Sequence, residues 1–221
     1  MRFSLPRYLL FDLDGTLLDS LPGVEFSVSC ALEAAGLPQT NVDLKCFLGP
    51  PIRTILSKIV RTEDPVLLNR LEVAFRESYD AEGWQKSTCY PGAHEVLVAM
   101  RTRGHRLVVV SNKPRRVSLR ILEREGLLPL FERIYTRDSQ IPACLSKDEM
   151  LTKVLRDMEI SPSECLMIGD TMEDVAAAAS NEIGMVLMEH GYGNLAPGAR
   201  ITMRLKGLSD FLEFLNVERT Q

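Results

Sequence analysis

YLLFDLDGTLLDS, residues 8–20, holds the strongest structural signal in this chain. A short apolar run that ends at a turn signal is typical of a fully buried strand. Asp12 and Asp14 stand at its carboxyl end, the edge at which open α/β sheets bind ligands. Because side chains alternate along a strand, both carboxylates lie on one face, and Gly15 lets the chain turn tightly beneath them. Two such close acids repel each other unless a cation or a shared proton intervenes.

An Asp-Gly pair is also common in hairpin turns, but here a helical pattern follows instead of a second strand. Three apolar stripes at helical spacing occupy residues 24–35, 52–60 and 68–79. Roughly 70 residues separate the first strand from Pro91, far more than a crossover connection requires. We therefore interpret residues 21–90 as a helical module inserted after the first strand.

From Pro91 onward the sequence alternates between helices and strands. The helices are predicted to begin at Pro91-Gly92, Pro114, the capping box Ser146–Glu149, Thr171 and Leu208. Buried strands are predicted at Leu107–Asn112, Ile134–Thr136, Cys165–Asp170 and Gly184–Met188. This alternation predicts an α/β fold with a doubly wound, Rossmann-like parallel sheet built from residues 1–20 and 91–221.

The composition is that of an ordinary soluble protein, with 45% hydrophobic and 25% charged residues in 221. A net charge of -4 argues against a nucleic-acid or membrane-surface partner, since those partners require a basic face. No apolar run approaches the roughly 18 residues that span a bilayer. The five cysteines are scattered and do not show the spacing of metal ligands, so we predict that they are reduced and that the protein is cytoplasmic. They are Cys30, Cys46, Cys89, Cys144 and Cys165.

If the sheet is parallel, polar residues from distant segments meet at its carboxyl edge. They are Asp12, Asp14, Ser111, Asn112 and Asp170. Carboxylates without soft ligands suit Mg²⁺, which leaves positions for water and phosphate oxygens. A bound phosphate also requires hydrogen-bond donors. We expect these to be the Ser111 hydroxyl, the backbone N–H groups near Gly15, and the Lys147 ammonium, which lies in the first turn of a helix. Taken separately, Ser111-Asn112 could be a strand-to-turn junction, Gly169-Asp170-Thr171 a helix N-cap and Lys147 a solvated lysine. Without a site at this edge, all three of these readings must hold at once.

Four motifs carry a resemblance to a known family. They are Asp12-Leu-Asp14-Gly-Thr16, Ser111-Asn112-Lys113-Pro114, Lys147 and Gly169-Asp170-Thr-Met-Glu-Asp174, and they span nearly the whole chain. With them the sequence resembles the haloacid dehalogenase-like hydrolases, in particular the phosphoglycolate phosphatase-like branch. Family lysines often precede a proline, whereas Lys147 precedes Asp148, so Lys153 is the alternative lysine.

The resemblance implies a phosphoric monoester hydrolase. Asp12 would be the nucleophile that forms an aspartyl-phosphate, and Asp14 the general acid and base. Mg²⁺ would be held by Asp12, the Asp14 backbone carbonyl and Asp170, with Asp174 binding through water or orienting the others. Ser111 and Lys147 would hold the phosphoryl group. The remaining substrate contacts are expected from Gly15, Thr16, Asn112 and Arg53.

The inserted module, residues 21–90, matches the helical cap domain of such enzymes, and the loop Leu48–Arg53 is expected to confer selectivity. Arg53 either meets an anionic part of the substrate or begins a surface helix. The expected function is a Mg²⁺-dependent phosphatase acting on a small phosphorylated metabolite. A sugar-phosphate mutase and a non-catalytic binding protein are the alternatives. Phosphoglycolate, a nucleoside monophosphate, pyrophosphate and a sugar phosphate all stay open as substrates, as does the oligomeric state.

Overall fold

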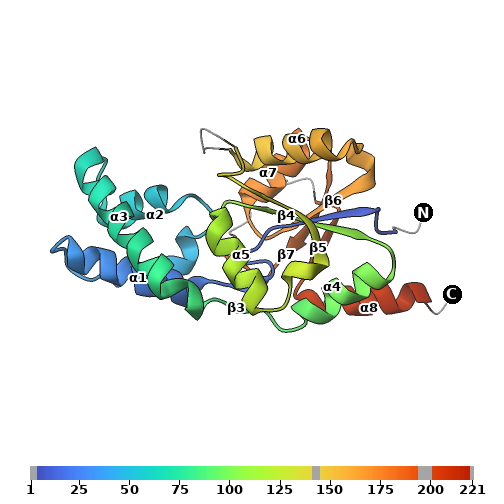
Figure 1. Cartoon of the computed structure of the whole chain (residues 1–221), viewed down its shortest axis with the longest axis horizontal. Coiled ribbons are helices and arrows are strands. Elements are labelled where there is room, and N and C mark those ends of the chain that lie inside the picture. Colours follow the sequence, from blue (N-terminus) through green and yellow to red (C-terminus); the bar gives the residue numbers. More distant parts are fainter. Residues whose placement is uncertain (1–3, 141–144, 194–200, 220–221) are drawn as a thin grey trace.

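The computed structural model describes residues 4–140, 145–193 and 201–219. A six-stranded sheet in the order β5-β4-β1-β6-β7-β8 forms the centre of the molecule (Figure 1). Every neighbouring pair of strands is parallel. The strands are β1 (Tyr8–Phe11), β4 (Arg106–Ser111), β5 (Phe131–Thr136), β6 (Cys165–Gly169), β7 (Gly184–Met188) and β8 (Met203–Leu205). The predicted doubly wound α/β sheet is confirmed, and β8 is an additional strand.

The chain reverses its direction of winding at β1. From there β4 and β5 are added on one side, and β6, β7 and β8 on the other. Phe11 pairs with Val109 of β4 and with Ile168 of β6. Asp12 follows directly and donates its N–H to the Ile168 carbonyl oxygen at 2.9 Å. It therefore stands at the topological switch point, where doubly wound sheets have their ligand crevice.

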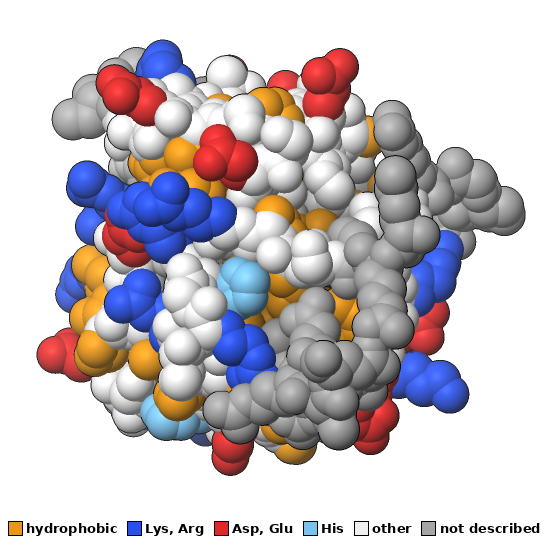
Figure 2. All heavy atoms as spheres, turned by 90° about the vertical axis from the view of Figure 1, so that its right-hand side faces the viewer, with side chains coloured by type: hydrophobic (Ala, Val, Ile, Leu, Met, Phe, Trp, Pro, Cys, Tyr) orange, Lys and Arg blue, Asp and Glu red, His pale blue; other side chains and the backbone are white. Residues whose placement is uncertain are grey.

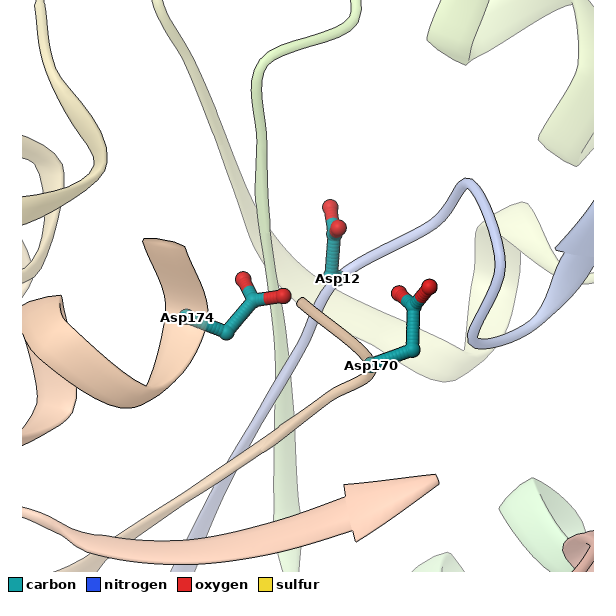
Figure 3. A group of neighbouring side chains, drawn as sticks. All are labelled: Asp12, Asp170 and Asp174. Carbon is teal, nitrogen blue, oxygen red and sulfur yellow. The ribbon is translucent and has the colours of Figure 1, made fainter. Parts of the chain in front are cut away.

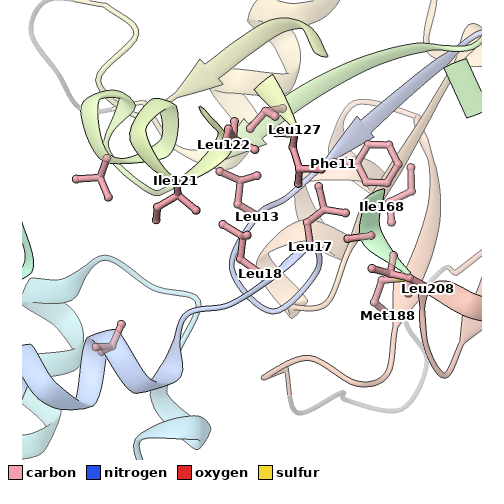
Figure 4. Packing of buried hydrophobic residues seen from close by; sticks show 14 of the residues in the cluster. Phe11, Leu13, Leu17, Leu18, Ile121, Leu122, Leu127, Ile168, Met188 and Leu208 are labelled. Carbon is pink, nitrogen blue, oxygen red and sulfur yellow. The ribbon is translucent and has the colours of Figure 1, made fainter. Parts of the chain in front are cut away.

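Helices cover both faces of the sheet, which explains why its strands read as continuous apolar runs. Leu9 and Phe11 face a cluster with α4 (Ala93–Thr102), α5 (Arg115–Arg124) and α8 (Leu208–Arg219). Leu10 faces a second cluster with α6 (Lys147–Met158) and α7 (Met172–Ser180). Leu13 and Leu17, from the loop after β1, belong to the first cluster (Figure 4). This packing fixes the loop that carries Asp12 and Asp14.

Between β1 and β4 the chain forms helices that lie beside the sheet, at the left of Figure 1. They are α1 (Leu21–Ala34), η1 (Leu44–Phe47), α2 (Ile52–Val60), α3 (Pro65–Ala81) and η2 (Gly83–Lys86). Two short antiparallel strands, β2 (Leu18–Asp19) and β3 (Thr88–Cys89), join this segment to the sheet. Sequence reasoning did not predict these strands. The division into a core and an inserted cap domain stays a prediction.

The remaining elements are two short 3₁₀ helices, η3 (Leu128–Leu130) and η4 (Pro162–Glu164). None of the described helices combines the length and the apolar character needed to cross a membrane. The cysteines at 30, 46, 89 and 165 are free, and Cys144 lies outside the described residues. On the face turned away from α1–α3, basic and acidic side chains are interspersed (Figure 2).

Candidate active site

Three carboxylates converge at the switch point of the sheet. Asp12 follows β1, Asp170 follows β6, and Asp174 lies in the first turn of α7 (Figure 3). One oxygen of each lies within 4.8 Å of the others, and all three residues are buried. The predicted convergence of Asp12 and Asp170 is thus found in the structure, and Asp174 joins them directly.

Neighbouring donors hold two of these carboxylates in place. Asp170 accepts the Thr16 hydroxyl at 3.1 Å and the Tyr192 N–H at 2.7 Å. Asp174 accepts both the N–H and the hydroxyl of Thr171, at 3.0 and 2.7 Å, in the capping box that begins α7. Tyr192 follows β7 and belongs to none of the motifs, so sequence reasoning missed it.

Lys147 supplies the positive charge of the cluster. The capping box of Ser146 and Glu149 begins α6 and places this lysine at its first position. Its Nζ lies 3.0 Å from Asp12 Oδ1 and 2.9 Å from Asp174 Oδ1, and it donates to the Val110 carbonyl oxygen at 3.2 Å. The alternative, Lys153, pairs with Asp157 at 2.8 Å on the same helix.

The cluster is short of positive charge. Three buried carboxylates and one ammonium group leave two negative charges when all are ionised. Burial raises the pKa of Asp12 to about 7 against the attraction of Lys147, and Asp174 and Asp14 raise it as well. Burial and the same carboxylate repulsion raise the pKa of Asp170 well above its usual range. A divalent cation would remove this imbalance.

Two oxygens in the cluster lack directed hydrogen bonds. Asp12 Oδ1 and Asp174 Oδ1 are fully buried and lie at ion-pair distance from Lys147, yet the angles do not make hydrogen bonds. Because buried polar atoms normally have such partners, these two oxygens are available as ligands. Hard carboxylate oxygens with this spacing fit Mg²⁺.

Gly15 and Thr16 lie beneath Asp170 and do not line the cavity described below. Gly15 has φ +84°, and a Cβ there would lie 2.2 Å from Asp170 Oδ2. Its N–H donates to the Leu18 carbonyl oxygen at 2.8 Å, so it is not free to bind phosphate in this arrangement. Both residues were predicted to bind substrate; here they position a candidate metal ligand.

Asp14 is not one of the three clustered carboxylates and pairs with Lys113. The Lys113 ammonium donates to both Asp14 oxygens, at 2.8 and 3.1 Å, and to Tyr79 Oη of α3 at 2.8 Å. Although burial alone lowers the pKa of Lys113, Asp14 and Tyr79 raise it above its usual range. Lys113 stands in the Ser111–Pro114 motif, but its contact with Asp14 was not predicted.

Ser111 is buried at the end of β4, lines the cavity and accepts the Lys113 N–H at 3.3 Å. Asn112 donates its amide to the Gly49 carbonyl oxygen at 3.3 Å and to Glu173 Oε2 at 2.9 Å. Asn112 thereby joins the loop before α2 to the first turn of α7.

Arg53 does not reach the site. It lies in the first turn of α2, and its guanidinium donates to Asn69 and Glu72 of α3, at 2.5 and 3.3 Å. It is absent from the lining of the cavity.

A cavity of about 130 Å³ separates the sheet edge from α2 and α3. Asp12, Asp14 and Ser111 line it on one side, and Ile55, Phe75 and Tyr79 on the other. At about 10–15 Å³ per water centre, it holds on the order of ten waters, or a small ligand. The arrangement is that of an α/β protein with a buried carboxylate–lysine centre open to a small cavity.

Comparison with known proteins identifies the class more closely. The sequence model of a family described as haloacid dehalogenase-like hydrolase matches residues 9–188. The chain therefore belongs to the haloacid dehalogenase-like hydrolase family.

Two curated proteins and one solved structure are similar to this chain along most of its length. Tyrosine-protein kinase PtkA of Mycobacterium tuberculosis is 33% identical over 189 residues, which cover 85% of this chain and 64% of PtkA. Phosphoglycolate phosphatase of Nitrosococcus oceani is 27% identical over 86% of each chain. The crystal structure of a predicted phosphatase from Clostridium acetobutylicum superposes with a TM-score of 0.84 and 28% identity, over 97% of this chain and all of that one. The predicted family and its phosphoglycolate phosphatase-like branch are confirmed. The phosphoglycolate phosphatase relative supports the predicted class of phosphoric monoester hydrolase.

Proposed function

We propose that this protein is a Mg²⁺-dependent phosphatase that hydrolyses a small phosphate monoester through an aspartyl-phosphate on Asp12. One observation carries the proposal: Asp12 lines the cavity and also lies in the buried cluster with Lys147, Asp170 and Asp174. A phosphate in the cavity would therefore meet a nucleophile, an ammonium group and a candidate metal site together. The phosphoglycolate phosphatase relative supports the same chemistry.

In the first step, an Asp12 oxygen forms a bond to phosphorus as the bond to the leaving oxygen breaks. Mg²⁺ held by Asp12, Asp170, Asp174 and the Asp14 carbonyl would neutralise the charge of the phosphoryl oxygens. Lys147 holds Asp12 at 3.0 Å and, with Ser111, is placed to stabilise the phosphoryl group in transfer.

Asp14 protonates the leaving oxygen and then removes a proton from the water that attacks the aspartyl-phosphate. The two hydrogen bonds from Lys113 suit the second of these steps, because they hold Asp14 as a carboxylate that accepts a proton. Proton donation in the first step requires one of these bonds to open.

We further propose that residues 21–90 act as a cap on a core made of residues 1–20 and 91–221. The paired strands β2 and β3 form both connections between the two parts. The hydrogen bond from Asn112 to Gly49 brings the loop before α2 over the cavity. Closure of this loop would exclude bulk water from the phosphoryl group. The free cysteines support a cytoplasmic location.

Phosphate release from phosphoglycolate and from p-nitrophenyl phosphate tests the proposal, with Mg²⁺ and again with EDTA. We expect release only with Mg²⁺, a phosphorylated Asp12 peptide in mass spectra after rapid quenching, and neither signal in Asp12→Asn. Glu95→Gln changes an exposed carboxylate in α4 and is the matched control, with unchanged activity. Equal release in EDTA, or by Asp12→Asn, would contradict the proposal.

The similarity to PtkA favours one other function, transfer of the phosphoryl group to a protein. The same assay separates it, because a transferase leaves radiolabel on an acceptor protein and little free phosphate. A mutase would instead require a sugar bisphosphate for activity, and a non-catalytic protein would neither release nor transfer phosphate.

A further inference from the structure

Arg137 is placed at the cavity by the edge of the sheet. Thr136, the last residue of β5, pairs with Ser111 at the end of β4, and Arg137 follows directly. Neighbouring strands lie about 4.8 Å apart, so Arg137 leaves the sheet one strand away from Ser111. The residue is half-buried and lines the cavity. The Leu145 N–H donates to its backbone carbonyl oxygen at 2.9 Å and fixes the chain at this point.

The other cations that line the cavity have acidic partners. Lys113 donates to Asp14 at 2.8 Å, and Arg76 donates to Glu72 Oε1 at 2.7 Å. Among residues 4–140, 145–193 and 201–219, by contrast, the Arg137 guanidinium makes no hydrogen bond and no ion pair. Arg137 thus brings to the cavity a guanidinium that has no acidic partner among these residues.

None of the acids that line the cavity forms an ion pair with Arg137. Asp12 lies against Lys147 and Asp14 against Lys113, at 3.0 and 2.8 Å. Asp80 lies 3.8 Å from Arg116. The nearby apolar walls, which include Ile55, Phe75 and Val117, offer no acceptor. A guanidinium is suited to pair with a carboxylate or phosphate through two parallel hydrogen bonds.

We propose that Arg137 binds a second anionic group of the substrate, away from the phosphoryl group that is transferred. This inference rests on the proposed function and makes it more specific. The substrate class is then a small phosphate monoester whose leaving group carries a carboxylate or a second phosphate. The cavity of about 130 Å³ suits a small substrate of this kind.

Three substrates built on the same two-carbon unit test the assignment. Phosphoglycolate carries a carboxylate, ethylene glycol bisphosphate a second phosphate, and 2-hydroxyethyl phosphate a neutral hydroxyl. For wild type, Arg137→Gln and Arg133→Gln, kcat and KM are measured on each. Arg133 is the matched control because it is exposed on β5 and does not line the cavity.

We expect Arg137→Gln to lose about 10- to 100-fold in kcat/KM on one or both anionic substrates, mainly through a higher KM. This is the loss expected when one charge-assisted hydrogen bond is removed. The substrate with the larger loss identifies the second anion as carboxylate or phosphate. On 2-hydroxyethyl phosphate the change should stay within about threefold, and Arg133→Gln should match wild type throughout.

Equal losses on all three substrates would overturn the proposal, since Arg137 would then contact the transferring phosphoryl group. Unchanged kinetics would overturn it as well. A binding measurement separates its failure from that of the proposed function: calorimetry compares Asp12→Asn with Asp12→Asn/Arg137→Gln on the same compounds. If no turnover occurs but the affinity for phosphoglycolate or the bisphosphate depends on Arg137, the catalytic proposal fails and this one stands. If the affinities of the two variants are equal, this one fails.

Discussion

Replacing Asp12 with Asn is expected to stabilise the metal-free protein while it abolishes turnover. Burial raises the pKa of Asp12 from 3.8 to about 7 despite the attraction of Lys147. The unfolded chain releases this proton near pH 4, whereas the folded chain keeps it to about pH 7. The folded state therefore binds the proton more tightly, and its stability falls as the pH rises through this window.

The magnitude follows from the difference between the two pKa values. At 1.36 kcal/mol for each factor of ten, the rise from 3.8 to about 7 corresponds to about 4 kcal/mol lost above pH 7. About 2 kcal/mol of this is already lost at pH 5. Asn keeps the size of the side chain and removes its charge. Lys147 retains Asp174 at 2.9 Å, so the substitution does not leave a buried ammonium unpaired.

Urea denaturation in EDTA, followed by circular dichroism at pH 5 and pH 8, measures the effect. Asp12→Asn should exceed wild type in unfolding free energy by about 4 kcal/mol at pH 8 and about 2 kcal/mol at pH 5. Glu95→Gln should stay within about 0.5 kcal/mol of wild type at both. With Mg²⁺ present, wild type should gain more stability than Asp12→Asn, because it has one more ligand. If Asp12→Asn is no more stable than wild type at pH 8 in EDTA, the reasoning is refuted.

Two further substitutions test how the site is held. Gly15→Ala should remove the rise in melting temperature on Mg²⁺ addition, because its Cβ would lie 2.2 Å from Asp170 Oδ2. Gly36→Ala is its control, because Gly36 also has a positive φ, +69°, but a Cβ there would have no atom within 4 Å. This variant should keep the Mg²⁺ response, at a cost of about 1–3 kcal/mol in stability. Lys113→Met should lower kcat by about 10- to 100-fold with little change in KM, because Asp14 loses the donor that positions it. Steady-state kinetics of this variant check the prediction, with Lys153→Met as the control because it removes an ion pair on α6. An unchanged kcat in Lys113→Met would show that Lys113 does not act through Asp14.

The central strands could be predicted from the sequence because both of their faces are buried. β1, β4, β6 and β7 read as apolar runs, and their carboxyl ends necessarily share one edge. The edge strands carry weaker signals. The polar pair Glu132-Arg133 interrupts β5, which the sequence placed only at residues 134–136. In β8 only Leu205 is buried, so no apolar run marks it.

Contacts between distant segments account for what sequence reasoning missed. β2 and β3 contain two residues each, and their pairing joins Leu18 to Cys89, so no local periodicity reveals it. Tyr192 contributes to the site through its backbone N–H, which any residue type could provide. Motifs identified the carboxylates that meet at the switch point, but the donors that hold them depend on how the loops pack.

The loop before α2 and the acidic cluster share side chains, and this links their positions. Asn112 donates from one amide nitrogen to Gly49 in the loop and to Glu173, next to Asp174. A Cβ at Gly49 would lie 3.0 Å from Thr171 Cγ2, and the Thr171 hydroxyl holds Asp174 at 2.7 Å. A loop that moves away therefore removes contacts from Thr171, which holds Asp174, and from Asn112, which bonds its neighbour Glu173. Linkage is reciprocal, so a cation that favours this position of Asp174 must also favour the loop over the cavity. The contacts that position Asp174 and those that hold the loop over the cavity are therefore linked.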